Sequence, residues 1–262
     1  MRLPGGVWRD GTLWRDFAFR PLNGEVELAI AESGVAQNPP AGVTAVLAAA
    51  LATVGGEAAT PEVVGGLAVG DRQFLVRRLA ARLGRDTVWL TCTCASCGAA
   101  FDVHIQQSAL PVKEAAEGYP FTTVTTARGS HRLRVPNGAD QEAIAGQDGD
   151  EAVAELLQRC SVDGSVPDAL SREEILAIDA ALEAVAPEVG LGLLATCPDC
   201  GTEQEVAVDP YLCLTQIGSE LFSEIHTLAV VYHWSEAQSL ALPVHRRRLY
   251  LKLIDRGRGM MG

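Results

Sequence analysis

Two Cys-x-x-Cys-Gly segments constrain the fold of this chain more than any other feature. The first spans Cys94–Gly98 and the second spans Cys197–Gly201. Two thiolates three residues apart on a tight turn form half of a tetrahedral zinc site, and two such halves leave no open coordination position. The sequence therefore predicts a structural Zn²⁺ ion. The four expected ligands are Cys94, Cys97, Cys197 and Cys200.

The long spacing between the two pairs calls for an explanation, because 99 residues separate Cys97 from Cys197. Four-cysteine ribbons have about 15–20 residues there. Closing the longer loop costs about 1.5 kcal/mol more, whereas structural zinc contributes on the order of 10 kcal/mol. Zinc binding therefore more than offsets the cost of the longer loop. Cys92 could replace Cys94 as a ligand. A redox pair is disfavoured because that use needs a helix N-terminus after the motif.

Composition and charge indicate a globular protein with two electrically different parts. The 262 residues are 48% hydrophobic and carry a net charge of −12, and the seven cysteines form an odd number. Residues 235–262 contribute six basic and two acidic side chains, which leaves −16 on the remainder. An acidic body disfavours nucleic-acid binding, which requires clustered Lys and Arg. With no apolar leader at the N-terminus, we expect a reducing compartment.

The longest uncharged apolar run, Ala41–Gly56, is too short to span a membrane, which requires about 20 residues. Its alanine content and flanking Pro40 predict a buried helix instead. We expect no insertion into a membrane.

An internal similarity predicts a duplicated α+β fold. Phe17–Ala31 aligns without gaps on His131–Ala145, and each of the two segments is followed by helices, a strand, a Cys-x-x-Cys knuckle and a second strand. The sequence thus predicts strand-helix-strand halves joined by a zinc-ribbon-like pair of knuckles, with a hairpin over residues 7–20. The expected divisions are a first repeat over 1–106, a second over 107–209 and a helical C-terminal arm over 210–262.

The expected arm combines aromatic and basic residues. Asp209-Pro210 is typical of a helix start, and an apolar stripe then runs from Leu214 to Tyr232. Ser235 with Gln238 is typical of a capping box for a short helix that Leu242-Pro243 ends. Aromatic residues and Arg are enriched in protein interfaces, although a helix folded back on the acidic body is an equal alternative. The candidate partner-binding residues are Tyr232, His233, Trp234, Arg246, Arg247, Arg248 and Tyr250.

No pattern in the sequence recommends an enzyme. Nucleotide-binding loops, nucleophile elbows and zinc-protease helices are absent from the sequence. His226 and His233 are separated by about 10 Å of helical rise, too far to share a metal, whereas His104 on the strand after the first knuckle could approach the zinc. We expect no catalytic residue and no small-molecule substrate.

The C-terminal segment and the body of the chain also resemble a known family. The segment from Ile225 to Ile254 is similar to a tail module of contractile phage tails and extracellular contractile injection systems. The body is similar to the T-even phage family of baseplate hub subunits and baseplate assembly chaperones, whose motifs recur at Phe19–Gly24 and Cys197–Gly201. The first knuckle departs from that pattern because it lacks proline.

The resemblance implies a non-enzymatic protein that binds hub, spike, tube or tape-measure proteins. It implies assembly in the bacterial cytoplasm, with the protein either released or retained in the baseplate. Two alternatives stay open: a zinc-ribbon nucleic-acid-binding or transcription-related protein that uses the basic tail, and, less favoured, a metalloenzyme.

Overall fold

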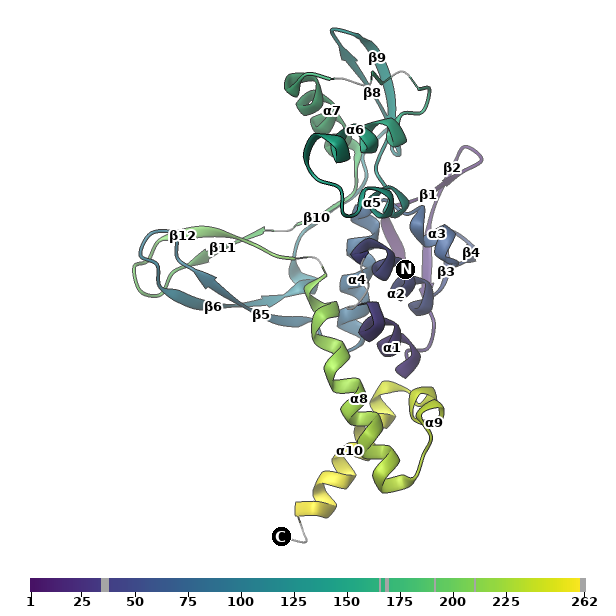
Figure 1. Cartoon of the computed structure of the whole chain (residues 1–262), viewed down its shortest axis with the longest axis vertical. Coiled ribbons are helices and arrows are strands. Elements are labelled where there is room, and N and C mark those ends of the chain that lie inside the picture. The colour runs from purple at the N-terminus through teal and green to yellow at the C-terminus, as the bar shows by residue number, and fades with distance from the viewer. Residues whose placement is uncertain (34–37, 165, 168–169, 191, 210, 260–262) are drawn as a thin grey trace.

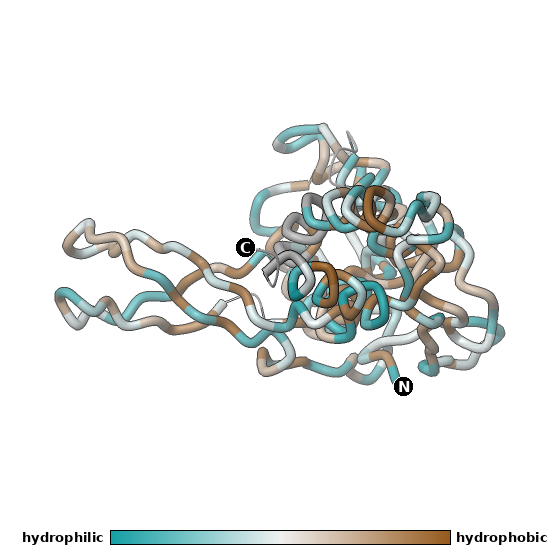
Figure 2. Tube along the Cα trace, turned by 90° about the horizontal axis from the view of Figure 1, so that it is seen from below, coloured by the Kyte–Doolittle hydropathy of each residue, from teal (hydrophilic) through white to brown (hydrophobic). Residues whose placement is uncertain are grey.

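The computed structural model describes residues 1–33, 38–164, 166–167, 170–190, 192–209 and 211–259, and the chain is mixed α/β. Figure 1 shows a central body, a lobe above it, a long finger to one side and a helical arm below. The finger is also clear of the body in the perpendicular view of Figure 2. The chain enters the finger twice, once from each half of the sequence.

The body begins with an antiparallel sheet in the order β1-β2-β3-β4. Its first hairpin turns at Asp10 and Gly11, whose φ angles of +50° and +75° are those of the tight turn that Asp-Gly favours. The predicted hairpin is confirmed, although its first strand starts at Arg2 rather than at residue 7. The strands are β1 (Arg2–Arg9), β2 (Thr12–Phe19), β3 (Leu51–Val54) and β4 (Glu57–Ala58).

Four helices pack on this sheet and form the main hydrophobic core, in which Ile30, Leu47 and Leu75 are fully buried. The prediction of one helix over Ala41–Gly56 is wrong in its second part. The helix ends at Ala50, because the next four residues pair with β2 and the following Gly55-Gly56 turn has positive φ angles. The helices are α1 (Gly24–Ser33), α2 (Pro39–Ala50), α3 (Pro61–Gly65) and α4 (Val69–Arg82).

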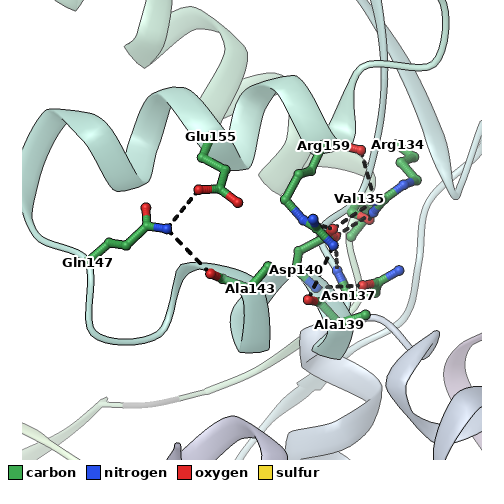
Figure 3. Close-up of polar contacts among 9 residues, drawn as sticks. All are labelled: Arg134, Val135, Asn137, Ala139, Asp140, Ala143, Gln147, Glu155 and Arg159. Atoms are coloured by element: carbon green, nitrogen blue, oxygen red, sulfur yellow. Dashed lines mark hydrogen bonds and ion pairs between the residues drawn. The ribbon is translucent and has the colours of Figure 1, made fainter.

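The lobe packs a hairpin against helices over a separate core that contains Leu133 and Ile178. Asp140 is buried between two guanidinium groups, with Arg134 donating to it at 2.5 and 2.8 Å and Arg159 at 3.2 Å (Figure 3). Burial alone would raise the pKa of Asp140, but these partners hold it below its usual value. The elements are β8 (Phe121–Thr126), β9 (Gly129–Arg134), α5 (Gly138–Ile144), α6 (Gly149–Cys160) and α7 (Arg172–Val185).

Two β-hairpins make the finger, each a separate two-stranded antiparallel sheet. Their facing sides bury small apolar clusters along the finger, including Phe101 with Val206 and Val88 with Val208. Short elements connect the finger to the body: η1 (Gln107–Ala109), β7 (Val112–Lys113) and β10 (Glu188–Val189). The finger strands are β5 (Thr87–Thr93), β6 (Ala100–Gln106), β11 (Gly192–Thr196) and β12 (Glu203–Ala207).

The arm consists of α8 (Leu212–Tyr232), α9 (Glu236–Ala241) and α10 (Val244–Gly259). The predicted start at Asp209-Pro210 falls partly on Pro210, which lies outside the described residues. The helix is assigned from Leu212, and Asp209 accepts a bond from the Tyr211 N–H just before it. Leu221 and Leu228 of the predicted stripe on α8 are buried, and Leu221 packs with Ile225 and Leu240 of α9. The side chain of Ile217 is not described. The capping box of Ser235 and Gln238 is confirmed.

Two helices begin at Asn-Gly, and in both the glycine makes room for an arginine. A Cβ on Gly138 would lie 2.1 Å from Nη1 of Arg72, and one on Gly24 would lie 2.9 Å from Nη1 of Arg247. Both arginines are fully buried.

The predicted division of the chain into three parts, with boundaries at residues 106 and 209, stays a prediction.

Candidate metal centre

The two Cys-x-x-Cys segments form turns of matching geometry at the ends of the finger hairpins. In the first turn, Cys94 N–H donates to the Ala99 carbonyl at 2.8 Å and Gly98 N–H donates to the Cys94 carbonyl at 2.9 Å. The second turn has the corresponding bonds at 2.9 Å each. Gly98 and Gly201 have φ angles of +76° and +72°, a conformation that glycine adopts without strain.

The turns bring together the four predicted sulfurs. One ligand atom from each of Cys94, Cys97, Cys197 and Cys200 lies within 4.8 Å of all the others. The Sγ atoms of Cys94 and Cys200 are 3.6 Å apart, and those of Cys97 and Cys197 are 3.8 Å apart. Four sulfurs around a tetrahedral ion with bonds of about 2.3 Å are separated by about 3.8 Å, whereas a disulfide requires about 2.05 Å. The four residues therefore fit a metal ion.

Side-chain contacts between the hairpins fix this geometry. The Gln204 side chain accepts a bond from Ala95 N–H at 2.9 Å and donates to the Thr93 carbonyl at 3.1 Å, so it joins the second hairpin to the first knuckle. Cys94 and Cys197 are buried against the apolar inner side, and Cys97 and Cys200 are exposed. The centre thus has one dry side and one side toward solvent.

Hydrogen bonds prepare two of the thiols for metal binding. The Thr202 hydroxyl and N–H lower the pKa of Cys200 to about 6, and the N–H groups of Cys97 and Ser96 lower the pKa of Cys94. The Ala99 N–H favours the Cys97 thiolate, but the neighbouring sulfurs of Cys200 and Cys94 outweigh it and raise the pKa of Cys97 to about 12. Such a cluster retains protons that a cation must displace.

Two other residues considered as possible ligands, Cys92 and His104, are not part of this cluster. Cys92 packs against the apolar cluster beside the centre, and its Sγ lies 3.9 Å from the Leu90 carbonyl oxygen; it is outside the group of four sulfurs, in which Cys94 takes the ligand position. The His104 ring packs against Trp89 at a tilt of 58°, with ring centroids 4.9 Å apart. The side chain of Cys213 lies outside the described residues.

The candidate partner-binding residues divide into a partly buried aromatic group and an arginine group. Tyr232 stacks on Trp234 with centroids 5.0 Å apart, and the Tyr250 ring meets both edge to face. His233 ends α8 in a left-handed conformation with φ +55° and is exposed.

Of the three predicted arginines, Arg246 is exposed, Arg248 is half-buried and Arg247 is fully buried. Arg247 donates to Glu224 at 2.7 Å and also pairs with Glu27 on α1. It is therefore not available to a partner in this arrangement, and it holds the arm on the body. The fold-back that the sequence left open is thus present for this part of the arm.

Sequence reasoning missed the buried polar residues of α4. Asp71, Arg72 and Arg77 are buried at positions where charged residues in a helix normally face solvent. Burial raises the pKa of Asp71 to about 6, against the opposing effect of N–H donors from Gly6 and Gly5. No local signal distinguishes these residues, because the segments that cover them are distant in the sequence.

A cavity of about 510 Å³ lies between α4, α6 and α7 and is lined mainly by apolar side chains. Its one thiol, Cys160, is a weak candidate nucleophile, because burial raises its pKa to about 12. Nothing in this cavity resembles an activated nucleophile paired with a base.

None of the helices in the described ranges combines the length and apolarity needed to cross a bilayer. Comparisons with known proteins add no relative: no protein-family model, curated protein or solved structure matches the chain. The centre is therefore interpreted from its own geometry.

Proposed function

We propose that the chain is a non-enzymatic hub or assembly protein of a phage-like contractile tail or injection system. In this proposal a structural Zn²⁺ ion stiffens the finger and the C-terminal arm binds partner proteins. The observation that carries the proposal is the convergence of the two knuckles, which places four sulfurs at spacings that suit Zn²⁺. Four sulfur ligands leave no coordination position for a substrate.

Further support comes from the paired Asn-Gly helix starts and the matching knuckle turns, which favour an internally duplicated, zinc-ribbon-like architecture. The resemblance of Phe19–Gly24 and of the segment after Ile225 to contractile-tail proteins supplies the biological context. Hub, spike, tube or tape-measure proteins are then the expected partners, in the bacterial cytoplasm during assembly and afterwards in the baseplate if the protein is retained.

The test has a biochemical and a cellular part. Purified protein should contain one equivalent of zinc by elemental analysis, and the Cys197→Ser variant should contain none. Disruption of the gene in its host should abolish complete contractile particles in electron micrographs, and wild-type protein should restore them. Normal particles without the gene would overturn the proposal.

Nucleic-acid binding is less favoured, because Arg247 is buried against carboxylates and leaves a smaller basic surface on the tail. A salt-dependent gel shift of duplex DNA or RNA by the wild-type protein would favour that alternative.

A further inference from the structure

A short helix followed by a long helix occurs twice in the structure, as α3–α4 and as α9–α10. Each pair begins with a hydroxyl cap: Thr60 accepts from Val63 N–H at 3.3 Å, and Ser235 accepts from Gln238 N–H at 3.2 Å. Each then continues through Leu-x-Val-x-x-Arg, at Leu67–Arg72 and Leu242–Arg247. The two segments therefore share both sequence and local structure.

The two helix pairs also dock in the same way. Ala68 bridges to Asn137 and Pro243 bridges to Asn23, in both cases antiparallel and one residue before the long helix. The buried arginine of each pair, Arg72 or Arg247, comes four residues after this bridging residue. It lies against the glycine that follows the bridged asparagine. Equivalent positions on α4 and α10 can therefore be compared residue by residue.

Extended backbone covers the face of α4 that carries Gly70, Asp71 and Arg77. Asp71 accepts N–H bonds of 2.8 Å from two residues of β1, and Arg77 donates to a carbonyl just after β10 at 2.5 Å. Gly70 lies so close to the chain before β10 that a Cβ would be 2.0 Å from a carbonyl oxygen. The covering residues are Gly5, Gly6, Pro187 and Gly190.

The equivalent face of α10 is open. His245, Arg246 and Lys252 occupy the positions of Gly70, Asp71 and Arg77, and all three are exposed. Between them Leu249 and Leu253 are 57% and 47% exposed. Arg246 has neither a side-chain hydrogen bond nor an ion pair with any residue that the structure describes. The face is thus a row of two leucines bordered by cations.

We propose that this face of α10 binds an extended, acidic segment of a partner protein. The shape follows from the related face of α4, which takes extended chain and satisfies its backbone groups. The charge follows from the residues that differ: Arg246 replaces a carboxylate that accepts N–H bonds, so the partner must supply acceptors, and the surrounding cations favour carboxylates. The two leucines require apolar side chains at alternate positions of that segment.

This inference rests on the proposed role of the arm in partner binding, and it names the surface and the chemistry of the partner. It is tested on the purified full chain, immobilised for selection from a displayed library of random 12-residue peptides. The enriched peptides are then synthesised with a fluorescent label, and their affinities are measured by anisotropy. Because no phage particle is involved, a negative result would leave the zinc and particle-assembly tests of the proposed function standing.

We expect enrichment of peptides that alternate acidic and β-branched residues. Their affinity should fall about tenfold in Arg246→Glu, because like charges then face each other, and also in Leu249→Ser. The matched control is Arg172→Glu, which changes an exposed arginine at the start of α7 and should leave the affinity unchanged. Zinc content and circular dichroism of each variant should match those of the wild type.

Four outcomes would overturn the proposal. The first is a lack of acidic peptides among the enriched sequences, and the second is binding of the enriched acidic peptides to Arg246→Glu as tightly as to the wild type. The third is Arg246-dependent binding of a 20-base-pair duplex without binding of acidic peptides. The fourth is self-association of the wild type that Arg246→Glu abolishes. The last two would assign the face to nucleic acid and to a second copy of the chain, respectively.

Discussion

The finger and the body of this protein are stabilised in different ways. The body buries a continuous apolar core that includes fully buried Leu47 and Leu75, and buried arginines pack against glycines where the lobe and the arm join it. The finger has only small apolar clusters between two hairpins and four sulfurs at its tip. Two-stranded hairpins are marginal on their own. We therefore expect the order of the finger to depend on a ligand bound by these sulfurs, whereas the order of the body depends on packing.

A fall in pH should change the stability of the finger and of the body in opposite directions. Metal binding requires thiolates, so we expect acid to weaken the finger as Cys200, whose pKa is about 6, gains a proton. Burial raises the pKa of Asp71 in the body, so its carboxylate is destabilising once ionised. The finger should lose order as the pH falls, whereas the contribution of Asp71 to the body is lost as the pH rises.

The largest expected effect separates the two regions through the metal. Cys197→Ser should abolish metal binding and remove on the order of 10 kcal/mol of stabilisation from the finger, while the melting transition of the body persists. Elemental analysis and hydrogen exchange of β5, β6, β11 and β12 measure this. Cys92→Ser, which leaves the four sulfurs intact, is the control. Simultaneous loss of protection in α1–α4 would show that finger and body are not independent.

The next largest effect tests the joint between arm and body. Arg247→Ala leaves Glu27 and Glu224 without their shared cation, and breaking a buried ion pair costs about 3–5 kcal/mol. Urea denaturation should detect the loss, and limited proteolysis should cut first near α9 and α10, with metal content unchanged. Arg246→Ala, at an exposed position, should change stability by less than about 0.5 kcal/mol. Equal effects of the two substitutions would refute the assigned role of Arg247.

A third effect isolates the pH response of the body. The pKa of Asp71 rises from an ordinary 3.8 to about 6 in the folded state, so its full contribution is present below pH 4 and is lost as the pH rises through about 6. The lost stabilisation is about 3 kcal/mol. Relative to wild type, Asp71→Asn should become more stable by about this amount between pH 4 and pH 7. A pH-independent difference in unfolding free energy would contradict the raised pKa.

The smallest effect tests the packing of a buried arginine against a glycine. Gly138→Ala places a methyl group 2.1 Å from Nη1 of Arg72, and such overpacking costs about 1–3 kcal/mol. Gly65→Ala is the matched control because its nearest atom, Cβ of Ala139, would be 4.0 Å away. Thermal denaturation of both variants decides the comparison. A Gly138 variant as stable as the control would mean that the arginine can move aside.

The sequence predicted the features that depend on local spacing. The Cys-x-x-Cys-Gly pattern identified all four clustered cysteines, because a knuckle is complete within six residues, and the Asp10-Gly11 turn and the box of Ser235 and Gln238 are equally local. The run from Ala41 to Gly56 was misjudged because a strand partner, β2, ended the helix early.

The buried arginines could not be predicted, because their sockets are assembled from distant parts of the chain. Arg247 is 220 residues from Glu27, and nothing near it in the sequence marks it as different from Arg246 or Arg248. The Leu-x-Val-x-x-Arg segments become recognisable as equivalents only after the docking of both is seen. Long-range satisfaction of a charge leaves no periodic signal in a single sequence.

The pairing of Glu27 with Arg247 has a consequence for biosynthesis. A ribosome makes about 5–20 residues per second, so α1 waits on the order of ten seconds or more for the helix that neutralises its buried carboxylate. During that interval the nascent chain presents an unfilled acidic socket at Gly24. A chain cut short before Arg247 lacks the cation that pairs with Glu27 and leaves this carboxylate without it.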